Sequence, residues 1–190
     1  GNELKPGQIY NSNLYVMADL AKESGSKVIT KEVIKDDKNA LRSFLKETLE
    51  QCDIIISSGG VSMGKYDYVR DVFIELGVKE RFWKVAQKPG KPLFFGNKSS
   101  TLIFGLPGNP ISSYIGFMIW VWPVLNMMMG NNKDRSVVAI LKENFPRESQ
   151  KHRFLFGKAW LEKGILVCKP SKKLGLFLWK PITIPFLLNS

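Results

Sequence analysis

A glycine-rich segment, Ser58-Gly59-Gly60-Val61-Ser62-Met63-Gly64, combines residue types that can bind an oxyanion. It follows the apolar run Ile54-Ile55-Ile56 and precedes a helical pattern. Glycines at such a place let the backbone turn tightly and expose amide N–H groups beside the positive end of a helix, which suits a phosphate. The segment matches neither the Walker A motif nor GxGxxG, so a tight structural turn is an equally good interpretation of this loop alone.

Lysines gather in a second segment, Lys84-Val85-Ala86-Gln87-Lys88-Pro89-Gly90-Lys91-Pro92. If the segment begins as a strand, its alternation places Lys84, Ala86 and Lys88 on one face, and Lys91 follows across a Pro-Gly turn. Ammonium groups that converge near the end of a sheet would hold a carboxylate or a phosphate. The alternative is a solvated, lysine-rich strand edge that discourages aggregation, which is favoured for Lys84 alone but not for the cluster.

Carboxylates near these segments are candidates for binding a divalent cation: Glu3, Asp36, Asp37 and Asp67. Asp36 and Asp37 follow a predicted strand, and Asp67 closes the glycine loop. Oxygen ligands next to a phosphate site are what Mg²⁺ requires. Asp37 is also an excellent N-cap for the next helix, and Asp67 could cap its own helix.

A proline-framed turn, Leu106-Pro107-Gly108-Asn109-Pro110, precedes a long apolar helix. We expect that helix to start near Ser112, whose hydroxyl could cap the helix or bind an oxyanion. A rigid strand-to-helix turn is the leading interpretation of this segment on its own.

The elements that would position these loops alternate between helix and strand patterns over residues 1–130. Helices are predicted over 12–23, 39–50, 68–76 and 111–129, and strands over 27–34, 53–57, 81–86, 93–95 and 101–104. This order predicts a three-layer α/β fold, with a mostly parallel sheet and helices on both faces. Ligands of such sheets bind beyond the carboxyl ends of the strands, where the unusual loops fall.

After Asp134 the pattern changes to strands without intervening helices, over 136–141, 154–161 and 165–169. We therefore expect a first domain over 1–133 and a small β-domain over 134–190.

The composition of the 190 residues excludes a disordered tail, a collagen and a coiled coil, because 44% are apolar and 24% are charged. The net charge of +11 favours anionic partners such as nucleic acid, an anionic membrane or phosphorylated small molecules. Scattered basic residues, and aromatic residues that fall in core patterns, argue against nucleic acid. Two cysteines and a single histidine argue against a disulfide framework, a zinc site and a Cys-His nucleophile, and favour a reducing compartment.

The stretch from Ile111 to Met129 carries no formal charge and is long enough to span a bilayer. The polar residues Ser112, Ser113 and Asn126 and the lack of a second span favour a core helix or an oligomer interface. The chain opens without a signal peptide, so we expect a cytoplasmic location and a piece of a longer gene product.

Taken together and in order, these motifs resemble one known family. Gly1-Asn2-Glu3-Leu4 is similar to the end of a Thr-Gly-Asp-Glu-Leu motif. The further motifs are Gly7-Gln8-Ile9-Tyr10-Asn11-Ser12-Asn13, the segment from Ser58 to Asp67, Lys88-Pro89-Gly90-Lys91-Pro92 and Gly105-Leu106-Pro107-Gly108-Asn109-Pro110-Ile111-Ser112. The resemblance, close over residues 1–130, is to the molybdopterin molybdenumtransferases, which include bacterial MoeA and the gephyrin E domain of animals.

The resemblance implies a molybdopterin-binding α/β domain followed by a small C-terminal β-barrel domain. It implies a reaction that inserts molybdate into adenylylated molybdopterin, releases AMP and forms the molybdenum cofactor, with Mg²⁺ assisting. The Mo ligands are the dithiolene sulfurs of the substrate, so the shortage of protein cysteine and histidine is no obstacle. Catalysis would then consist of positioning and charge neutralisation.

The resemblance also assigns roles to particular residues. Molybdate would be held by Lys88, Lys91, Ser112 and Arg153. The catalytic residues would be Asp36, Asp67, Lys84 and Lys88, and the metal ligands Glu3 and Asp67. The pocket for molybdopterin and nucleotide would be formed by Gly59, Gly60, Ser62, Gly64, Pro107, Gly108, Asn109 and Pro110. Lysine and hydroxyl donors suit molybdate because it is a tetrahedral dianion.

The chain also departs from the family. It begins at the family's third domain, so the two preceding domains, much of the homodimer contact and some active-site residues are expected to be missing. The family's Ser-Gly-Ser/Met-Ser run is replaced by residues 173–179, which predicts an incomplete or altered β-domain, as from a shifted reading frame near Gly175. Two alternatives stay open: the preceding adenylyltransferase step, and a pterin-binding or scaffold module without catalysis. The Lys-Pro-Gly-Lys-Pro turn and the β-domain favour insertion over adenylylation.

Overall fold

The computed structural model describes residues 11–34, 37–61, 68–131, 136–144 and 151–171, together with the backbone of 185–187. The chain divides into two compact units. The first comprises Gly1–Val85 and Gly90–Asn132, and the second Ala86–Pro89 and Lys133–Ser190. Each unit is described by itself.

The helices of the first unit begin at side-chain caps that the local sequence supplies. They are α1 (Ser12–Glu23), α2 (Lys38–Gln51), α3 (Val69–Glu75), α4 (Pro110–Gly116), a π-helical turn η1 (Phe117–Val121) and α5 (Trp122–Met128). The carboxylate of Asp37 accepts hydrogen bonds from the first amides of α2, which confirms its predicted role as a cap. Helix α1 is capped by Asn11, whose side chain accepts from the amide of Leu14, and it covers the predicted range 12–23.

The sheet of the first unit has four strands in the order β1 (Ile54–Ser58), β5 (Thr101–Leu106), β4 (Phe94–Lys98) and β2 (Lys79–Trp83). Strands β1 and β5 are parallel, whereas β4 is antiparallel to both β5 and β2. The α/β class is confirmed, but the described sheet is mixed and not mostly parallel. The reason is connection length: only Ser99 and Ser100 separate β4 from β5, and a link this short can form a hairpin but not a parallel crossover.

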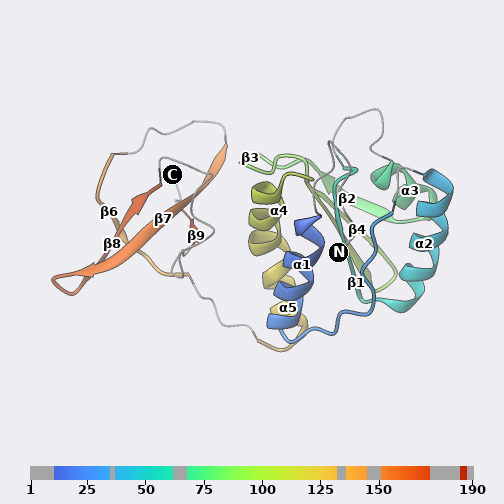
Figure 1. Ribbon diagram of the computed structural model, residues 1–190, viewed down its shortest axis with the longest axis horizontal. Coiled ribbons are helices and arrows are strands. Elements are labelled where there is room, and N and C mark those ends of the chain that lie inside the picture. Colours follow the sequence, from blue (N-terminus) through green and yellow to red (C-terminus); the bar gives the residue numbers. More distant parts are fainter. Residues whose placement is uncertain are drawn as a thin grey trace, which may run out of the picture. The chain divides into compact units, whose positions relative to one another are not determined.

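Helices cover both faces of this sheet, which confirms the expected three layers (Figure 1). Helices α2 and α3 pack on one face around a core that includes Leu45, Val72 and Phe94. Helix α1 and the stretch from α4 to α5 pack on the other face around Leu106 and Phe117. The predicted core role of the aromatic residues is confirmed for Phe94, Phe104 and Phe117, whose exposed fractions are 0%, 2% and 0%.

The stretch Pro110–Met128 is, within the described residues, the one helical segment long and apolar enough to cross a membrane by length and composition. One such helix is weak evidence for a span, because the core helix of a globular protein passes the same test. Its residues Phe117, Val121 and Leu125 belong to the second core cluster, as predicted for a core helix.

The strand predicted over 27–34 does not form, because these residues pair with no strand. Ile29 and Val33 are exposed, and a cavity of about 690 Å³ lies among this segment, α1, α2 and β1. The run of β-branched residues expresses a local preference, but a strand also needs a backbone partner, and this segment makes no ladder with β1.

The second unit is a small sheet. Its strands are ordered β3 (Gln87–Lys88), β7 (His152–Glu162), β8 (Ile165–Pro170) and β6 (Ile140–Leu141), and β9 (Pro185–Leu187) also pairs with β7. Strands β7 and β8 form a hairpin across Lys163 and Gly164, which both have positive φ, as a two-residue type I′ turn requires. The strands predicted over 154–161 and 165–169 are confirmed, whereas the one predicted over 136–141 is reduced to β6.

Candidate functional site

Two loops leave the sheet of the first unit at the same edge. Because β1 and β5 are parallel neighbours with Ser58 opposite Leu106, the Gly59-Gly60 loop and the Pro107–Pro110 loop both start beyond their carboxyl ends. The amide of Gly59 donates to the carbonyl of Leu106 over 2.9 Å. The predicted convergence of these two loops is therefore confirmed at this edge, which is where α/β sheets bind their ligands.

The backbones of the two loops lie close together at Gly59 and Gly108. A Cβ placed on Gly59 would lie 3.9 Å from the Cα of Gly108, and one placed on Gly108 would lie 3.6 Å from the Cα of Gly59. Gly60 has φ +70°, and a Cβ there would come within 2.3 Å of the Cγ2 of Val69. Glycine is thus required at position 60 by both conformation and space, since an L-residue would be strained and would collide with α3.

A side chain from α1 ties the two loops together. The amide nitrogen Nδ2 of Asn13 donates to the hydroxyl of Ser58 over 2.8 Å and to the carbonyl of Gly108 over 2.9 Å. The hydroxyl of Ser58 also bonds the carbonyl of Pro107 and the hydroxyl of the fully buried Ser113. Three elements, α1, β1 and α4, therefore meet in one polar network, which we call the Asn13 clamp (Asn13, Ser58, Gly108 and Ser113).

The proline-framed turn supplies the N-cap of the helix that follows it. Helix α4 begins at Pro110, and the side chain of Asn109 accepts from the amide and from the hydroxyl of Ser112. Ser112 is 8% exposed. The helix thus starts two residues before Ser112. Of the two roles expected for the Ser112 hydroxyl, that of helix cap is wrong, because Asn109 caps the helix and Ser112 donates to it, and that of oxyanion ligand stays a prediction.

The lysine segment does not continue as one strand. Strand β2 ends at Trp83, and Lys84 has φ +70°, which turns the chain out of the extended path. The prediction that Lys84, Ala86 and Lys88 share one strand face is therefore wrong, because their alternation is interrupted at Lys84. The amide of Lys84 donates a hydrogen bond to the carbonyl of Leu93, which holds this turn against the residue that precedes β4.

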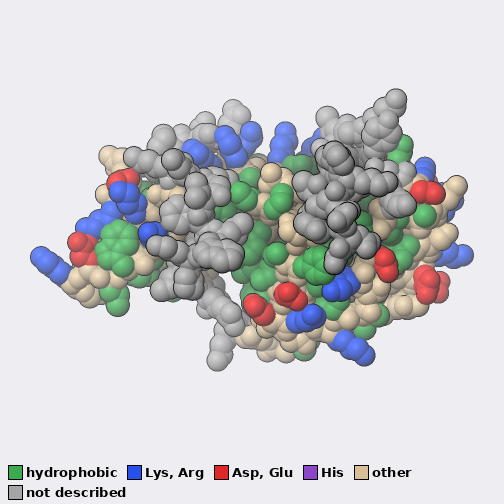
Figure 2. All heavy atoms as spheres, viewed as in Figure 1, with side chains coloured by type: hydrophobic (Ala, Val, Ile, Leu, Met, Phe, Trp, Pro, Cys, Tyr) green, Lys and Arg blue, Asp and Glu red, His purple; other side chains and the backbone are tan. Residues whose placement is uncertain are grey.

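In the second unit, Lys88 lies opposite Arg153 in the parallel pair of β3 and β7. Residues opposite each other in a ladder project on the same face of the sheet, so these two cations are neighbours. Lys91 belongs to the first unit. On the face shown in Figure 2, lysine and arginine side chains (blue) occur on both units, and acidic side chains (red) lie near some of them.

Several predicted site residues lie outside the described part of the chain: Glu3, Asp36, Ser62, Gly64 and Asp67. Among the residues that are described, no group of three or more His, Cys, Asp or Glu side chains is placed to hold a metal ion. The proposed metal ligands therefore stay predictions.

Burial raises the pKa of two cysteines and one tyrosine among the described residues. Desolvation raises the pKa of the Cys52 thiol, and the neighbouring Asp53 carboxylate adds to this rise. Desolvation also raises the pKa of Cys168 and that of Tyr114, the latter with help from Glu23. These shifts favour the neutral forms of the three side chains.

Sequence reasoning missed the residues that hold the site together. The sequence patterns assign no site role to Asn13, Ser113 or Trp83. Asn13 contacts residues 45 and 95 positions away, so no local pattern signals its role. The available clue was an additional polar side chain at the start of α1, beyond the one needed for capping.

Comparison with known proteins places these features in a family. Residues 1–127 match the family described as probable molybdopterin-binding domain. The chain is 34% identical over 168 residues to the molybdopterin molybdenumtransferase of Nostoc sp., covering 85% of this chain and 38% of that protein. It is 31% identical over 169 residues to the molybdopterin molybdenumtransferase of Bacillus subtilis, covering 88% of this chain and 39% of that protein.

A solved structure of the molybdopterin biosynthesis MoeA protein from Pyrococcus horikosii is similar in fold and sequence. The TM-score is 0.73 and the identity 34%, over 91% of this chain and 41% of that one. The chain thus spans about two fifths of the length of these relatives. The match over residues 1–127 covers more than half of the chain and includes both loops of the site. The chain therefore belongs to the family of probable molybdopterin-binding domains.

Proposed function

We propose that this chain acts in molybdenum cofactor biosynthesis, as the part of a molybdopterin molybdenumtransferase that binds the pterin and inserts molybdate. The substrate would be adenylylated molybdopterin, and AMP would be the leaving product. The observation that carries this proposal is the contact between Gly59 and Gly108, held by the Asn13 clamp at the carboxyl edge of β1 and β5. Because neither residue carries a side chain, the ligand would meet the backbone of both loops there.

The chain's own residues would position and neutralise the reacting groups. Gly59, Gly60 and the turn Pro107, Gly108, Asn109 and Pro110 would shape the pterin and phosphate pocket. Lys88 and Arg153 supply two adjacent positive charges on the sheet of the second unit, which suit a tetrahedral dianion. From the resemblance, Lys91 and Ser112 would also bind molybdate, and Lys84 would contact the substrate.

A divalent cation fits the remaining donor set. Glu3, Asp36 and Asp67 offer carboxylate oxygens, the donor type that Mg²⁺ prefers. When bound, Mg²⁺ would neutralise charge on the phosphoanhydride of the substrate. We further propose that the two expected domains, 1–133 and 134–190, are a pterin-binding domain and a small β-domain, and that the full-length protein is a cytoplasmic homodimer. These points are supported by the resemblance alone.

The test is turnover by the purified chain. With adenylylated molybdopterin, Mg²⁺ and molybdate, AMP release that depends on molybdate is the expected result. Lys88→Ala should impair molybdate dependence far more than Lys22→Ala, a matched control on the exposed side of α1. Binding of the pterin without any AMP release would refute catalysis by this chain and favour a binding module, and equal effects of the two substitutions would refute the role of Lys88.

A further inference from the structure

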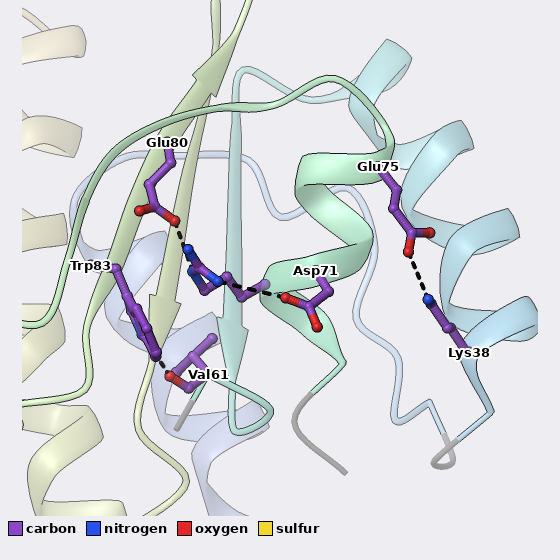
Figure 3. A network of polar contacts seen from close by, with 7 residues as sticks. Lys38, Val61, Asp71, Glu75, Glu80 and Trp83 are labelled. Atoms are coloured by element: carbon purple, nitrogen blue, oxygen red, sulfur yellow. Dashed lines mark hydrogen bonds and ion pairs between the residues drawn. The ribbon is translucent and has the colours of Figure 1, made fainter. Parts of the chain in front are cut away.

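Trp83, at the end of β2, connects several segments of the candidate site. Its indole Nε1 donates a hydrogen bond to the carbonyl of Val61 over 3.0 Å, as Figure 3 shows. Val61 directly follows Gly59 and Gly60 and is only 1% exposed. The glycine loop is thus held from two directions, by the Asn13 clamp at Ser58 and by Trp83 at Val61.

The ring of Trp83 also contacts two cations. The guanidinium carbon of Arg70 lies 4.3 Å from the ring centroid, and the ammonium nitrogen of Lys84 lies 3.9 Å from it. Both distances are within the range of a cation–π interaction. Arg70 is fixed in turn by Glu80, whose carboxylate accepts from Nε over 2.8 Å, and it approaches Asp71 at 3.6 Å.

The left-handed backbone of Lys84 explains how its ammonium reaches this ring. Strand residues next to each other point to opposite faces, so an extended Lys84 would project away from Trp83. With φ +70°, the chain turns at Lys84 and the side chain folds back over the indole of the preceding residue. A non-glycine residue in this region costs free energy, so the neighbouring contacts must hold it there.

We propose that Trp83 is a positioning residue that fixes the glycine loop and the Lys84 ammonium relative to each other. The hydrogen bond from the indole N–H to the carbonyl of Val61 holds the glycine loop. The contact between the ring face and the Lys84 ammonium holds the lysine side chain. The consequence for the reaction, but not the positioning itself, rests on the proposed function. If Trp83 were only a packing residue, phenylalanine would replace it with little effect, because it fills much of the same volume.

Two substitutions separate the two contacts. Trp83→Phe keeps an aromatic ring for the cations and removes the N–H donor, whereas Trp83→Leu removes both. Trp120→Phe is the matched control, since Trp120 packs against Phe82 in the other core cluster. Circular dichroism of all three variants establishes that they fold before the comparisons are made.

The first measurement is amide hydrogen exchange without any ligand. In Trp83→Phe we expect the amides of Gly60 and Val61 to exchange about fivefold faster than in the wild type, the effect of losing one net hydrogen bond. Trp120→Phe should leave these rates unchanged. If Trp83→Phe exchanges at the wild-type rate there, or if the control accelerates equally, the link between Trp83 and the loop is overturned.

The second measurement follows Lys84 by NMR after its amine is labelled with ¹³C-methyl groups, which preserves the charge. Ring currents should shift the Lys84 methyl signal upfield in the wild type and in Trp83→Phe, but not in Trp83→Leu. A wild-type signal at the position of an exposed lysine would overturn this half of the proposal.

The third measurement is the rate of AMP release. Both Trp83 variants should lower kcat, with Trp83→Leu the slower of the two. Wild-type-like kcat in both variants would overturn the catalytic consequence. Absence of AMP release from the wild type would instead refute the proposed function, while the exchange rates and the lysine signal would still decide whether Trp83 positions the loop.

Discussion

Removing the side chain that joins the two loops should destabilise the first unit by a modest and calculable amount. Asn13 makes two hydrogen bonds, of 2.8 and 2.9 Å, to Ser58 and Gly108. Each contributes about 0.5–1.5 kcal/mol net, and both lie where water can replace the lost donor, so the lower half of the range applies. Alanine is the better helix former by up to about 0.7 kcal/mol, which offsets part of the loss. We expect Asn13→Ala to lower the free energy of unfolding by about 1 kcal/mol.

An aspartate at the same position gives a sharper test. Asn13→Asp keeps the shape, but an ionised carboxylate cannot donate and would face the carbonyl oxygen of Gly108. We therefore expect this variant to be less stable than Asn13→Ala at pH 7. Ser12→Ala, one residue earlier on the exposed side of α1, is the matched control and should be neutral or slightly stabilising.

The assay is urea unfolding, monitored by amide NMR signals of β1 and β5 so that the first unit is followed alone. The pterin affinity of each variant is measured alongside. If Asn13→Asp unfolds at the same urea concentration as Ser12→Ala, the clamp does not stabilise the loops and the reasoning is refuted.

Three further predictions concern other parts of the chain. Gly108→Ala should unfold in urea like the wild type, because its Cβ would make ordinary contact at 3.6 Å, but it should bind pterin more weakly. Gly60→Ala should instead lose about 2–4 kcal/mol of stability in urea unfolding, because its Cβ would lie within 2.3 Å of the Cγ2 of Val69. Neighbouring basic side chains on α2 lower the pKa of Glu75, so its ion pairs stabilise the fold above the unfolded pKa and this contribution is lost as pH falls below about 4.5. The difference in stability between Glu75→Gln and the wild type should therefore be largest near pH 7 and shrink in acid, beyond any change seen with Glu50→Gln; a pH-independent difference would contradict this. Iodoacetamide should alkylate Cys52 more slowly at pH 8 in the native chain than after denaturation, because burial raises its pKa, and equal rates would count against that burial.

Features set by neighbouring residues could be predicted from the sequence. Helix α2 and its cap Asp37 follow from a local pattern, and the structure places the helix within one residue of the expected bounds at each end. The convergence of the loops at Gly59 and Gly108 could also be predicted, because strand–helix alternation determines which strand ends meet.

Features that depend on distant contacts or on a single dihedral angle could not be predicted. The sign of φ at Lys84 decides whether the lysines share a face, and residue type gives no signal for it at a lysine. The segment 27–34 has strand composition, yet pairing requires a second backbone. The clamp at Asn13 and the contact from Trp83 to Val61 each join residues more than twenty positions apart.

The short strand β3 has a practical consequence for dissecting this protein. The chain leaves the first unit after Val85, pairs Gln87 and Lys88 with β7, and returns at Gly90. Truncating the protein near residue 133 would therefore remove β7, the partner of β3. Residues 86–89 would remain in the middle of the truncated chain with unpaired backbone groups. To fold on its own, the first unit would need both the truncation and the replacement of residues 86–89 by a short turn that joins Val85 to Gly90.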